Sequence, residues 1–106
     1  MEYPKRKPYR NKRIKKAARD ESCTLMMNGC TGGGEDTVYA HSNYGEDGKG
    51  MSQKADDCFG CFACSSCHAV LDGHKKHDYS AEDLRHYFHC AMKRTWRRLL
   101  DLEILK

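Results

Sequence analysis

The sequence predicts a small α+β domain with two short strands, a short helix and a long C-terminal helix. Residues 37–41 and 59–63 have the β-branched and aromatic composition of strands, and residues 80–104 repeat apolar side chains with a helical period. Seven cysteines accompany a shortage of aliphatic residues, since Leu, Ile, Val and Phe make up 14 of 106 residues. Such a share is typical of chains without a hydrophobic core.

A fold of this composition needs a second source of stability. Burying 14 such side chains contributes roughly 20–40 kcal/mol, whereas ordering about 85 residues costs on the order of 1–2 kcal/mol each. Small domains of this kind are commonly held together by disulfides or bound metal. The odd number of cysteines and the lack of an apolar leader favour metal in a reducing compartment.

Residues 1–19 form a strongly basic arm. They carry nine Lys and Arg against Glu2 alone, a net charge of +8, while residues 20–106 carry ten against fourteen acids, or -4. Such an arm suits a nucleic-acid phosphate backbone; the alternative is a solubilising tail without a partner. We expect it to be partly disordered, with a helical stretch over residues 11–18 because Ile14 and two alanines share a face.

The middle of the chain alternates loops with short elements. Residues 20–30 form an irregular loop with a turn at Asn28-Gly29. The first strand, residues 37–41, precedes a long loop over residues 43–57 of a kind that is often functional. The second strand, residues 59–63, leads into a helix over residues 65–72, which Gly73 ends.

The helix over residues 80–104 is the clearest element. Ser80 is its predicted N-cap, and Glu82 and Asp83 place negative charge in its first turn. The apolar stripe, expected to pack on the core, comprises Leu84, Tyr87, Phe88, Ala91, Met92, Thr95, Trp96, Leu99 and Leu100. The opposite face is partly basic.

Four cysteines form the predicted metal site. Cys64 and Cys67 make a C-x2-C knuckle, and Cys23 with Cys30 supplies a second pair upstream. A C-x2-C turn lets two thiolates reach one tetrahedral Zn²⁺ at about 2.3 Å, and a helix N-terminus favours the thiolate form. We therefore predict a structural zinc ion on these four residues.

Other cysteine chemistries stay open. Residues 58–67 place cysteines at C-x2-C-x2-C-x2-C, close to a [4Fe–4S] pattern that has a last spacing of three followed by Pro. Residues 64–68 also fit the C-x-x-C-H of c-type haem, and buried free thiols are a third alternative. If residues 59–63 form a strand, Cys58 and Cys61 point to opposite faces and do not share an ion. Cys90 has no assigned role.

Two histidines define a predicted catalytic site beside the zinc. His41 ends the first strand and His68 begins the following helix, so we expect them to face one cleft. Asp72 follows His68 by four residues on the same helical face. A divalent ion on His68 and Asp72 would polarise a phosphodiester, while neutral His41 would activate water. For each histidine alone, a structural or surface role is the alternative.

These features resemble the zinc-containing branch of the HNH endonucleases, which share the ββα-metal fold. The resemblance is greatest to the YbcO-like family of small nucleases from lambdoid prophages. It spans about residues 15–72 and rests on Lys16-Ala17-Ala18-Arg19, Cys23 with Cys30, Ala40-His41, Ala63-Cys64-Ser65-Ser66-Cys67-His68 and Asp72. It implies structural zinc on the cysteines, His41 as general base and His68 as a ligand of a catalytic Mg²⁺ or Mn²⁺.

The chain departs from this family pattern at one position. HNH enzymes with such a helix usually have an Asn five residues before the first knuckle cysteine, where this chain has Phe59. Asp57, Asp56 and Asn43 are the candidates to orient His41 instead.

We therefore predict a single zinc-stabilised HNH-like domain over residues 20–106, preceded by the arm. Its predicted activity is metal-dependent hydrolysis of DNA in phage or prophage recombination or processing, in the bacterial host cytoplasm. DNA would bind through residues 1–19 and the basic face of the last helix. The alternative is a non-catalytic zinc module that binds nucleic acid. No apolar run approaches the roughly 18 residues of a membrane span.

Overall fold

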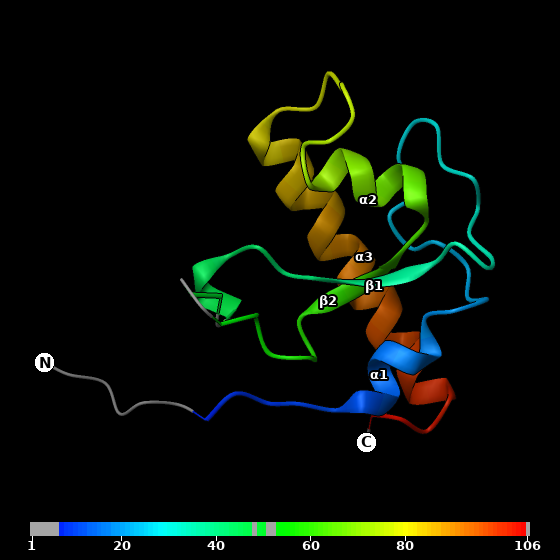
Figure 1. The fold of residues 1–106 in the computed structure, drawn as a ribbon, viewed down its shortest axis with the longest axis vertical. Helices are drawn as coiled ribbons and strands as arrows, with labels where there is room; N and C mark the ends of the chain where they lie inside the picture. The colour runs from blue at the N-terminus through cyan, green and yellow to red at the C-terminus, as the bar shows by residue number, and fades with distance from the viewer. Residues whose placement is uncertain (1–6, 48, 51–52, 106) are drawn as a thin grey trace, which may run out of the picture.

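The computed structural model describes residues 7–47, 49–50 and 53–105. The elements in chain order are α1 (Lys12–Ala17), β1 (Val38–His41), the 3-10 helix η1 (Gly45–Asp47), β2 (Gly60–Ala63), α2 (Ser65–Leu71) and α3 (Ala81–Asp101). The predicted α+β class is confirmed, with both strands and the long C-terminal helix. The hairpin of β1 and β2 lies between α2 and α1, and α3 runs past both (Figure 1).

The two strands form an antiparallel sheet in which Tyr39 lies opposite Phe62 and His41 lies opposite Gly60. Gly60 is required by close approach, because a Cβ there would lie 2.6 Å from the Ala40 carbonyl oxygen and from the Tyr39 ring. The Tyr39 ring therefore occupies the space over Gly60. Its centroid is 5.2 Å from that of His41, so both rings lie on the same face of the sheet.

Each face of the hairpin is covered by different elements. Tyr39 and Phe62 pack with Ile14 of α1 and Leu99 of α3. The other face belongs to a larger cluster, which brings together Cys23, Leu25, Met27, Ala40, Cys61, Ala63, Cys64, Cys67, Val70, Phe88, Ala91 and Met92. Thus α1 covers the Tyr39 face, α2 covers the Ala40 face, and α3 contributes to both clusters.

The predicted helical stretch of the basic arm is confirmed as α1. Asn11 is its N-cap, with a side-chain oxygen that accepts the Arg13 backbone N–H, and Ile14 and Ala18 are buried. The Asp57 backbone N–H donates to the Tyr9 carbonyl at 2.9 Å. This part of the arm therefore packs on the domain, while residues 1–6 lie outside the described residues.

Helix α3 begins as predicted but ends before residue 104. Ser80 and Asp83 form a reciprocal capping box at its start. Its last helical residue is Asp101, because Glu103 has a φ of 60° and turns the chain out of the helix. The Ile104 N–H then donates to the Leu99 carbonyl at 2.9 Å, and residues 104–105 pack against the Ile14 cluster.

Thr95 joins α3 to the sheet from a fully buried position. Its Oγ1 accepts the Phe62 backbone N–H at 3.2 Å and lies 2.9 Å from the Thr24 hydroxyl oxygen. Thr24 in turn donates its backbone N–H to the Phe62 carbonyl at 2.8 Å. The loop that carries Cys23 is thereby fixed beside β2. Among the helices of the described residues, none has the length and apolar character needed to cross a bilayer.

We predict that Ile14→Ala lowers the free energy of unfolding by about 2–5 kcal/mol, as expected for truncating a fully buried aliphatic side chain. Urea denaturation of the two proteins measures this difference. Lys12→Ala, on the exposed side of the same helix, is the control and should change stability by less than about 0.5 kcal/mol. Equal stability of both variants would mean that α1 is not part of the folded core.

Candidate functional site

The four predicted cysteine ligands come together in the structure. The sulfur atoms of Cys23, Cys30, Cys64 and Cys67 all lie within 4.8 Å of one another, and all four are free thiols. Ligands about 2.3 Å from a tetrahedral zinc ion are separated by about 3.8 Å, and the Cys30 and Cys64 sulfurs are 3.8 Å apart. The cysteine quartet therefore has dimensions that fit a tetrahedral metal ion.

Local backbone structure orients the sulfur atoms. Cys64 is the N-cap of α2, and its sulfur accepts the backbone N–H of Cys67 at 3.4 Å. The sulfur of Cys30 accepts the Gly32 N–H at 3.3 Å, and Gly32 has a φ of 87° that favours glycine. These N–H groups point partial positive charge at the sulfurs, which favours thiolates.

The pKa values of the thiols in the cysteine quartet depend on burial, on neighbouring sulfurs and on hydrogen-bond donors. Burial raises the pKa of Cys30 and of Cys67, and the neighbouring Cys23 sulfur raises both further. Burial also raises the pKa of Cys64, but the Cys67 N–H and the donors of Thr31 outweigh it and lower the value to about 6. Without a metal, the thiols of Cys30 and Cys67 stay protonated at neutral pH, whereas a bound divalent ion would let them ionise.

The remaining cysteines lie outside this group. Cys61 is fully buried in the core and burial raises the pKa of its thiol. Cys58 precedes β2, and its carbonyl accepts the Trp96 indole N–H at 2.6 Å. The Cys90 sulfur lies 3.7 Å from Nε2 of His86 on α3. Within residues 7–47, 49–50 and 53–105, the quartet is the one group of three or more Cys, His, Asp or Glu that could hold a metal.

His41 forms a pair with Asp57. The Nε2 atom of His41 lies 2.9 Å from Oδ1 of Asp57, and the side chains are 15% and 6% exposed. The other carboxylate oxygen accepts the Asn11 backbone N–H at 2.6 Å. Burial alone would raise the pKa of Asp57, but the hydrogen bonds from His41 and Asn11 outweigh burial, so the pKa is lowered. Asp57 is therefore a carboxylate at neutral pH.

The charge of Asp57 determines the tautomer of His41. A carboxylate only accepts hydrogen bonds, so Nε2 of His41 donates to Asp57, and in a neutral ring Nδ1 is then the acceptor. This arrangement suits a base that takes a proton from water. Of the three candidates that the sequence left open to orient His41, the structure brings Asp57 to its ring. The sequence does not indicate this contact, because His41 and Asp57 are 16 positions apart.

His68 forms a separate pair with Asp72. Its Nε2 lies 3.0 Å from Oδ2 of Asp72 along α2, and the two side chains are 39% and 34% exposed. Helix α2 packs on the Ala40 face of the hairpin, whereas His41 shares the opposite face with Tyr39. The expectation that His41 and His68 face one cleft is therefore wrong, because alternation along β1 directs His41 away from α2.

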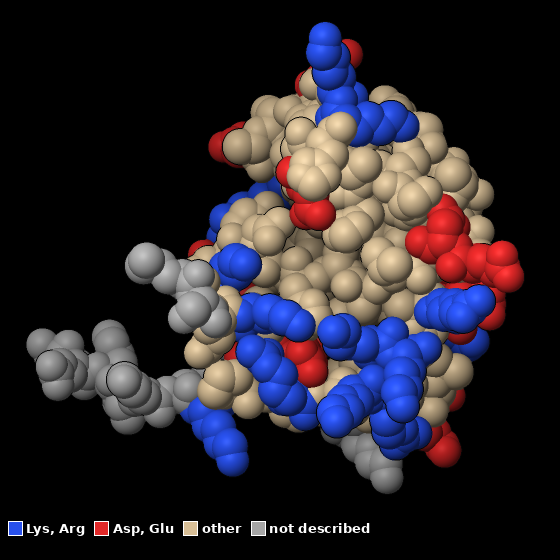
Figure 2. All heavy atoms as spheres, viewed as in Figure 1, with Lys and Arg blue, Asp and Glu red and all other residues tan. Residues whose placement is uncertain are grey.

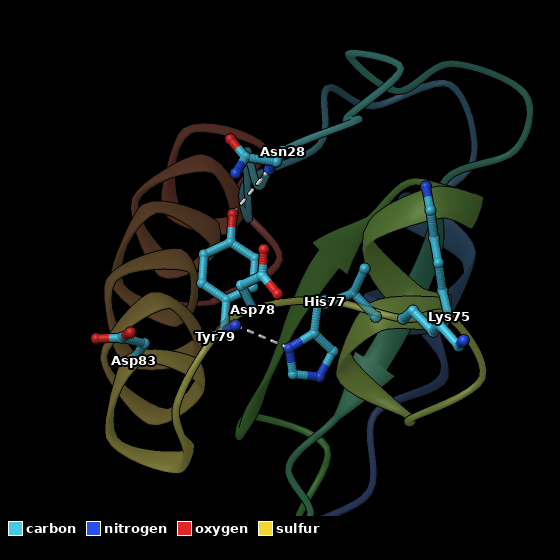
Figure 3. Close-up of a pocket in the computed structure, with 8 residues that line it drawn as sticks. Asn28, Lys75, His77, Asp78, Tyr79 and Asp83 are labelled. Carbon is cyan, nitrogen blue, oxygen red and sulfur yellow. Dashed lines mark hydrogen bonds between the residues drawn. The ribbon is translucent and has the colours of Figure 1, made fainter.

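A cavity of about 420 Å³ lies between the α2–α3 loop and the loop that carries Asn28 (Figure 3). The hydroxyl of Tyr79 accepts the Asn28 N–H at 2.9 Å, and Nδ1 of His77 accepts the Tyr79 N–H at 3.0 Å. The lining comprises Asn28, Val70, Lys75, Lys76, His77, Asp78, Tyr79 and Asp83. None of the predicted catalytic residues is among them, so this cavity is separate from the His41–Asp57 pair.

Comparisons with known proteins point to one family. The model of the family described as "Putative nuclease YbcO" matches residues 12–104. A solved structure described as "Structure of a putative bacteriophage protein from Escherichia coli str. K-12 substr. MG1655" is 28% identical, with a TM-score of 0.65. The match covers 85% of this chain and 99% of that chain. No curated protein matches. The family match includes α1, the cysteine quartet, both histidine pairs and α3.

We predict that the purified protein carries one metal ion per chain on the cysteine quartet and unfolds when that ion is removed. A structural zinc site contributes about 10–16 kcal/mol of apparent binding free energy, against a usual net stability of about 5–15 kcal/mol. Circular dichroism and thermal melting before and after chelation measure the effect, with elemental analysis to verify removal.

A pair of serine substitutions locates the metal on the quartet. Cys64→Ser should lower the metal content and the melting temperature, whereas Cys90→Ser, outside the quartet, should leave both unchanged. An unchanged spectrum and melting curve after verified removal of the metal would contradict a structural role.

Proposed function

Since the chain belongs to the YbcO family, we propose that it is a metal-dependent endonuclease that hydrolyses DNA phosphodiester bonds, in phage or prophage recombination or processing. Membership in a family described as nucleases supports the coarser part, a nuclease-like role. The observation that carries the finer proposal is the His41–Asp57 pair, a histidine with one nitrogen held by a buried carboxylate. We assign zinc as the metal of the cysteine quartet because four thiolates in a tetrahedron are typical of structural zinc.

His41 takes the role of general base in this proposal. Its Nδ1 accepts a proton from water, and the resulting hydroxide oxygen forms a bond to phosphorus while the bond to the leaving oxygen breaks. The imidazolium that forms remains hydrogen-bonded through Nε2 to the Asp57 carboxylate, which stabilises its positive charge. The leaving oxygen gains negative charge, and a divalent ion would supply the stabilisation it needs.

His68 and Asp72 do not fit as ligands of an ion that acts on the same phosphate as His41. They bond to each other on α2, which covers the opposite face of the hairpin. His68 and Asp72 therefore take no part in the proposed catalytic step. The proposed dependence on Mg²⁺ or Mn²⁺ rests only on the need to stabilise negative charge on the leaving oxygen.

The proposed DNA surface is the exposed side of α1. The cations on α1 and just after its end all face solvent and, within the described part of the chain, form no ion pair. They are Lys12, Arg13, Lys15 and Lys16 of α1 and Arg19 beyond it. Lys and Arg gather over the part of the surface where α1 lies (Figure 2). By contrast, Arg97 and Arg98 of α3 pair with Asp101 and Glu21 at 2.9 and 2.6 Å. The basic face of α3 is thus partly neutralised within the protein, which favours α1 as the main contact.

A cavity between α1 and the β1 edge lies beside this surface. It measures about 410 Å³ and is lined by Lys15, Ala18, Arg19, Glu35, Thr37, Val38 and Tyr39. Tyr39 is two residues from His41 along β1, a distance of about 7 Å at the rise of a β-strand. A phosphate backbone held by Lys15 and Arg19 would therefore lead toward the proposed base.

The second candidate function is a zinc module that binds nucleic acid without cleaving it. It is favoured by the lack, among the described residues, of a second group of three metal ligands near His41. Salt-sensitive DNA binding through α1 with no cleavage under any divalent ion would support this alternative.

We predict that His41→Ala lowers the cleavage rate of plasmid and branched DNA by about 10²–10⁴-fold, the usual contribution of a general base. Gel assays with Mg²⁺, with Mn²⁺ and with a chelator measure the rate and its dependence on metal. DNA affinity and circular dichroism should stay at wild-type values, because the substitution leaves α1 and the cysteine quartet intact.

The control is His74→Ala, a substitution of an exposed histidine in the α2–α3 loop. It should cleave at the wild-type rate. Cleavage by His41→Ala at the wild-type rate would show that the catalytic assignment is wrong.

A further inference from the structure

Two segments far apart in sequence, residues 9–11 and 54–57, are joined by hydrogen bonds. The Asp57 N–H donates to the Tyr9 carbonyl at 2.9 Å, and the Asn11 N–H donates to Oδ2 of Asp57 at 2.6 Å. Asp57 is therefore held by its backbone and by its side chain. The partner in both bonds belongs to the basic N-terminal segment rather than to the sheet.

Arg10 completes this connection through its guanidinium group. It donates to the carbonyls of Ala55 at 2.8 Å and Lys54 at 3.1 Å. One of its nitrogens also lies 3.5 Å from Oδ1 of Asp57, the same oxygen that lies 2.9 Å from Nε2 of His41. Arg10 and His41 thus contact one carboxylate oxygen from two sides.

Arg10 acts on the Asp57 segment mainly through the geometry of its hydrogen bonds rather than through its charge. Its side chain is 42% exposed, so solvent screens its charge on Asp57. The planar guanidinium, however, can donate to several acceptors in a fixed fork, and it bridges two consecutive carbonyls just before Asp57. A lysine ammonium at this position would keep the charge without the planar fork.

We propose that Arg10 is a positioning residue for the His41–Asp57 pair, so that the basic segment proposed to bind DNA also holds the proposed base in its active tautomer. This inference rests on the proposed function and deepens it. When Arg10 is lost, the segment before Asp57 loosens and the carboxylate no longer stays in line with Nε2. Both neutral tautomers of His41 then form, and the fraction with a free Nδ1 falls.

The kinetic test compares Arg10→Ala with Arg13→Ala in the full, metal-loaded chain. Both substitutions remove one exposed cation, but the Arg10 guanidinium donates to the carbonyls of Lys54 and Ala55, whereas Arg13 donates its backbone N–H to the Asn11 side chain. KM for plasmid DNA should rise equally in both. We expect kcat of Arg10→Ala to fall roughly 10–100-fold below that of Arg13→Ala, the usual effect of displacing a catalytic group. Arg10→Lys should recover KM but not kcat.

A spectroscopic test does not depend on cleavage. In protein labelled with ¹⁵N-histidine, at about pH 8 where an ordinary imidazole is neutral, the His41 ring should show the Nε2–H tautomer in wild type and in Arg13→Ala. Arg10→Ala and Arg10→Lys should show a mixture of tautomers. The spectrum of His41→Ala assigns the signal, and circular dichroism verifies folding; if Arg10→Ala is unfolded, Arg10→Lys carries the test.

The outcomes separate this proposal from the proposed function. A wild-type chain that cleaves no DNA overturns the nuclease, and the spectra alone then decide the role of Arg10. A pure Nε2–H tautomer in both Arg10 variants would overturn the positioning role. A kcat for Arg10→Ala within twofold of the Arg13→Ala value would also overturn the positioning role, as would full recovery of kcat in Arg10→Lys.

Discussion

The alternation of side chains along β1 is the constraint on which the rest of this small structure depends. Successive residues of a strand face opposite sides, so Tyr39 and His41 share one face while Ala40 faces the other. With only two strands in the described sheet, each face is covered by a separate set of elements. The cysteine quartet and the His41–Asp57 pair are therefore built on opposite sides of one hairpin.

The Ala40 side holds the larger of the two buried clusters. Its cluster contains three of the quartet cysteines together with Val70 of α2 and Phe88 of α3. A metal on the quartet would tie the loop before β1 to the start of α2. Thr95 adds a second connection, since its buried hydroxyl joins α3, β2 and the Thr24 loop. The shortage of aliphatic residues is thus partly offset by these polar connections, to which a metal on the quartet would add.

Features with a local signal were predictable from the sequence, and features that depend on packing direction were not. The strand composition, the N-cap at Ser80 and the C-x2-C knuckle each depend on residues a few positions apart, and the structure has them all. The partner of His41 was left open between three residues, because which of them reaches its ring depends on the path of a long loop. The arrangement of His41 and His68 was mispredicted, because alternation puts His41 on one face of the strand but does not say which face the following helix will cover.

The separation of the two faces has a consequence for how the proposed chemistry is controlled. A buried carboxylate normally costs free energy, and Asp57 is kept ionised by donors from His41 and from Asn11. The residues beside it, 9–11, continue directly into α1, whose outward cations face the proposed DNA. The carboxylate that contacts His41 is therefore held by the N-terminal segment and not by the cysteine quartet. A metal on the quartet would act on the proposed base only by keeping the hairpin folded, whereas contacts made along α1 would reach it through Asn11, the N-cap of α1 that also donates to Asp57.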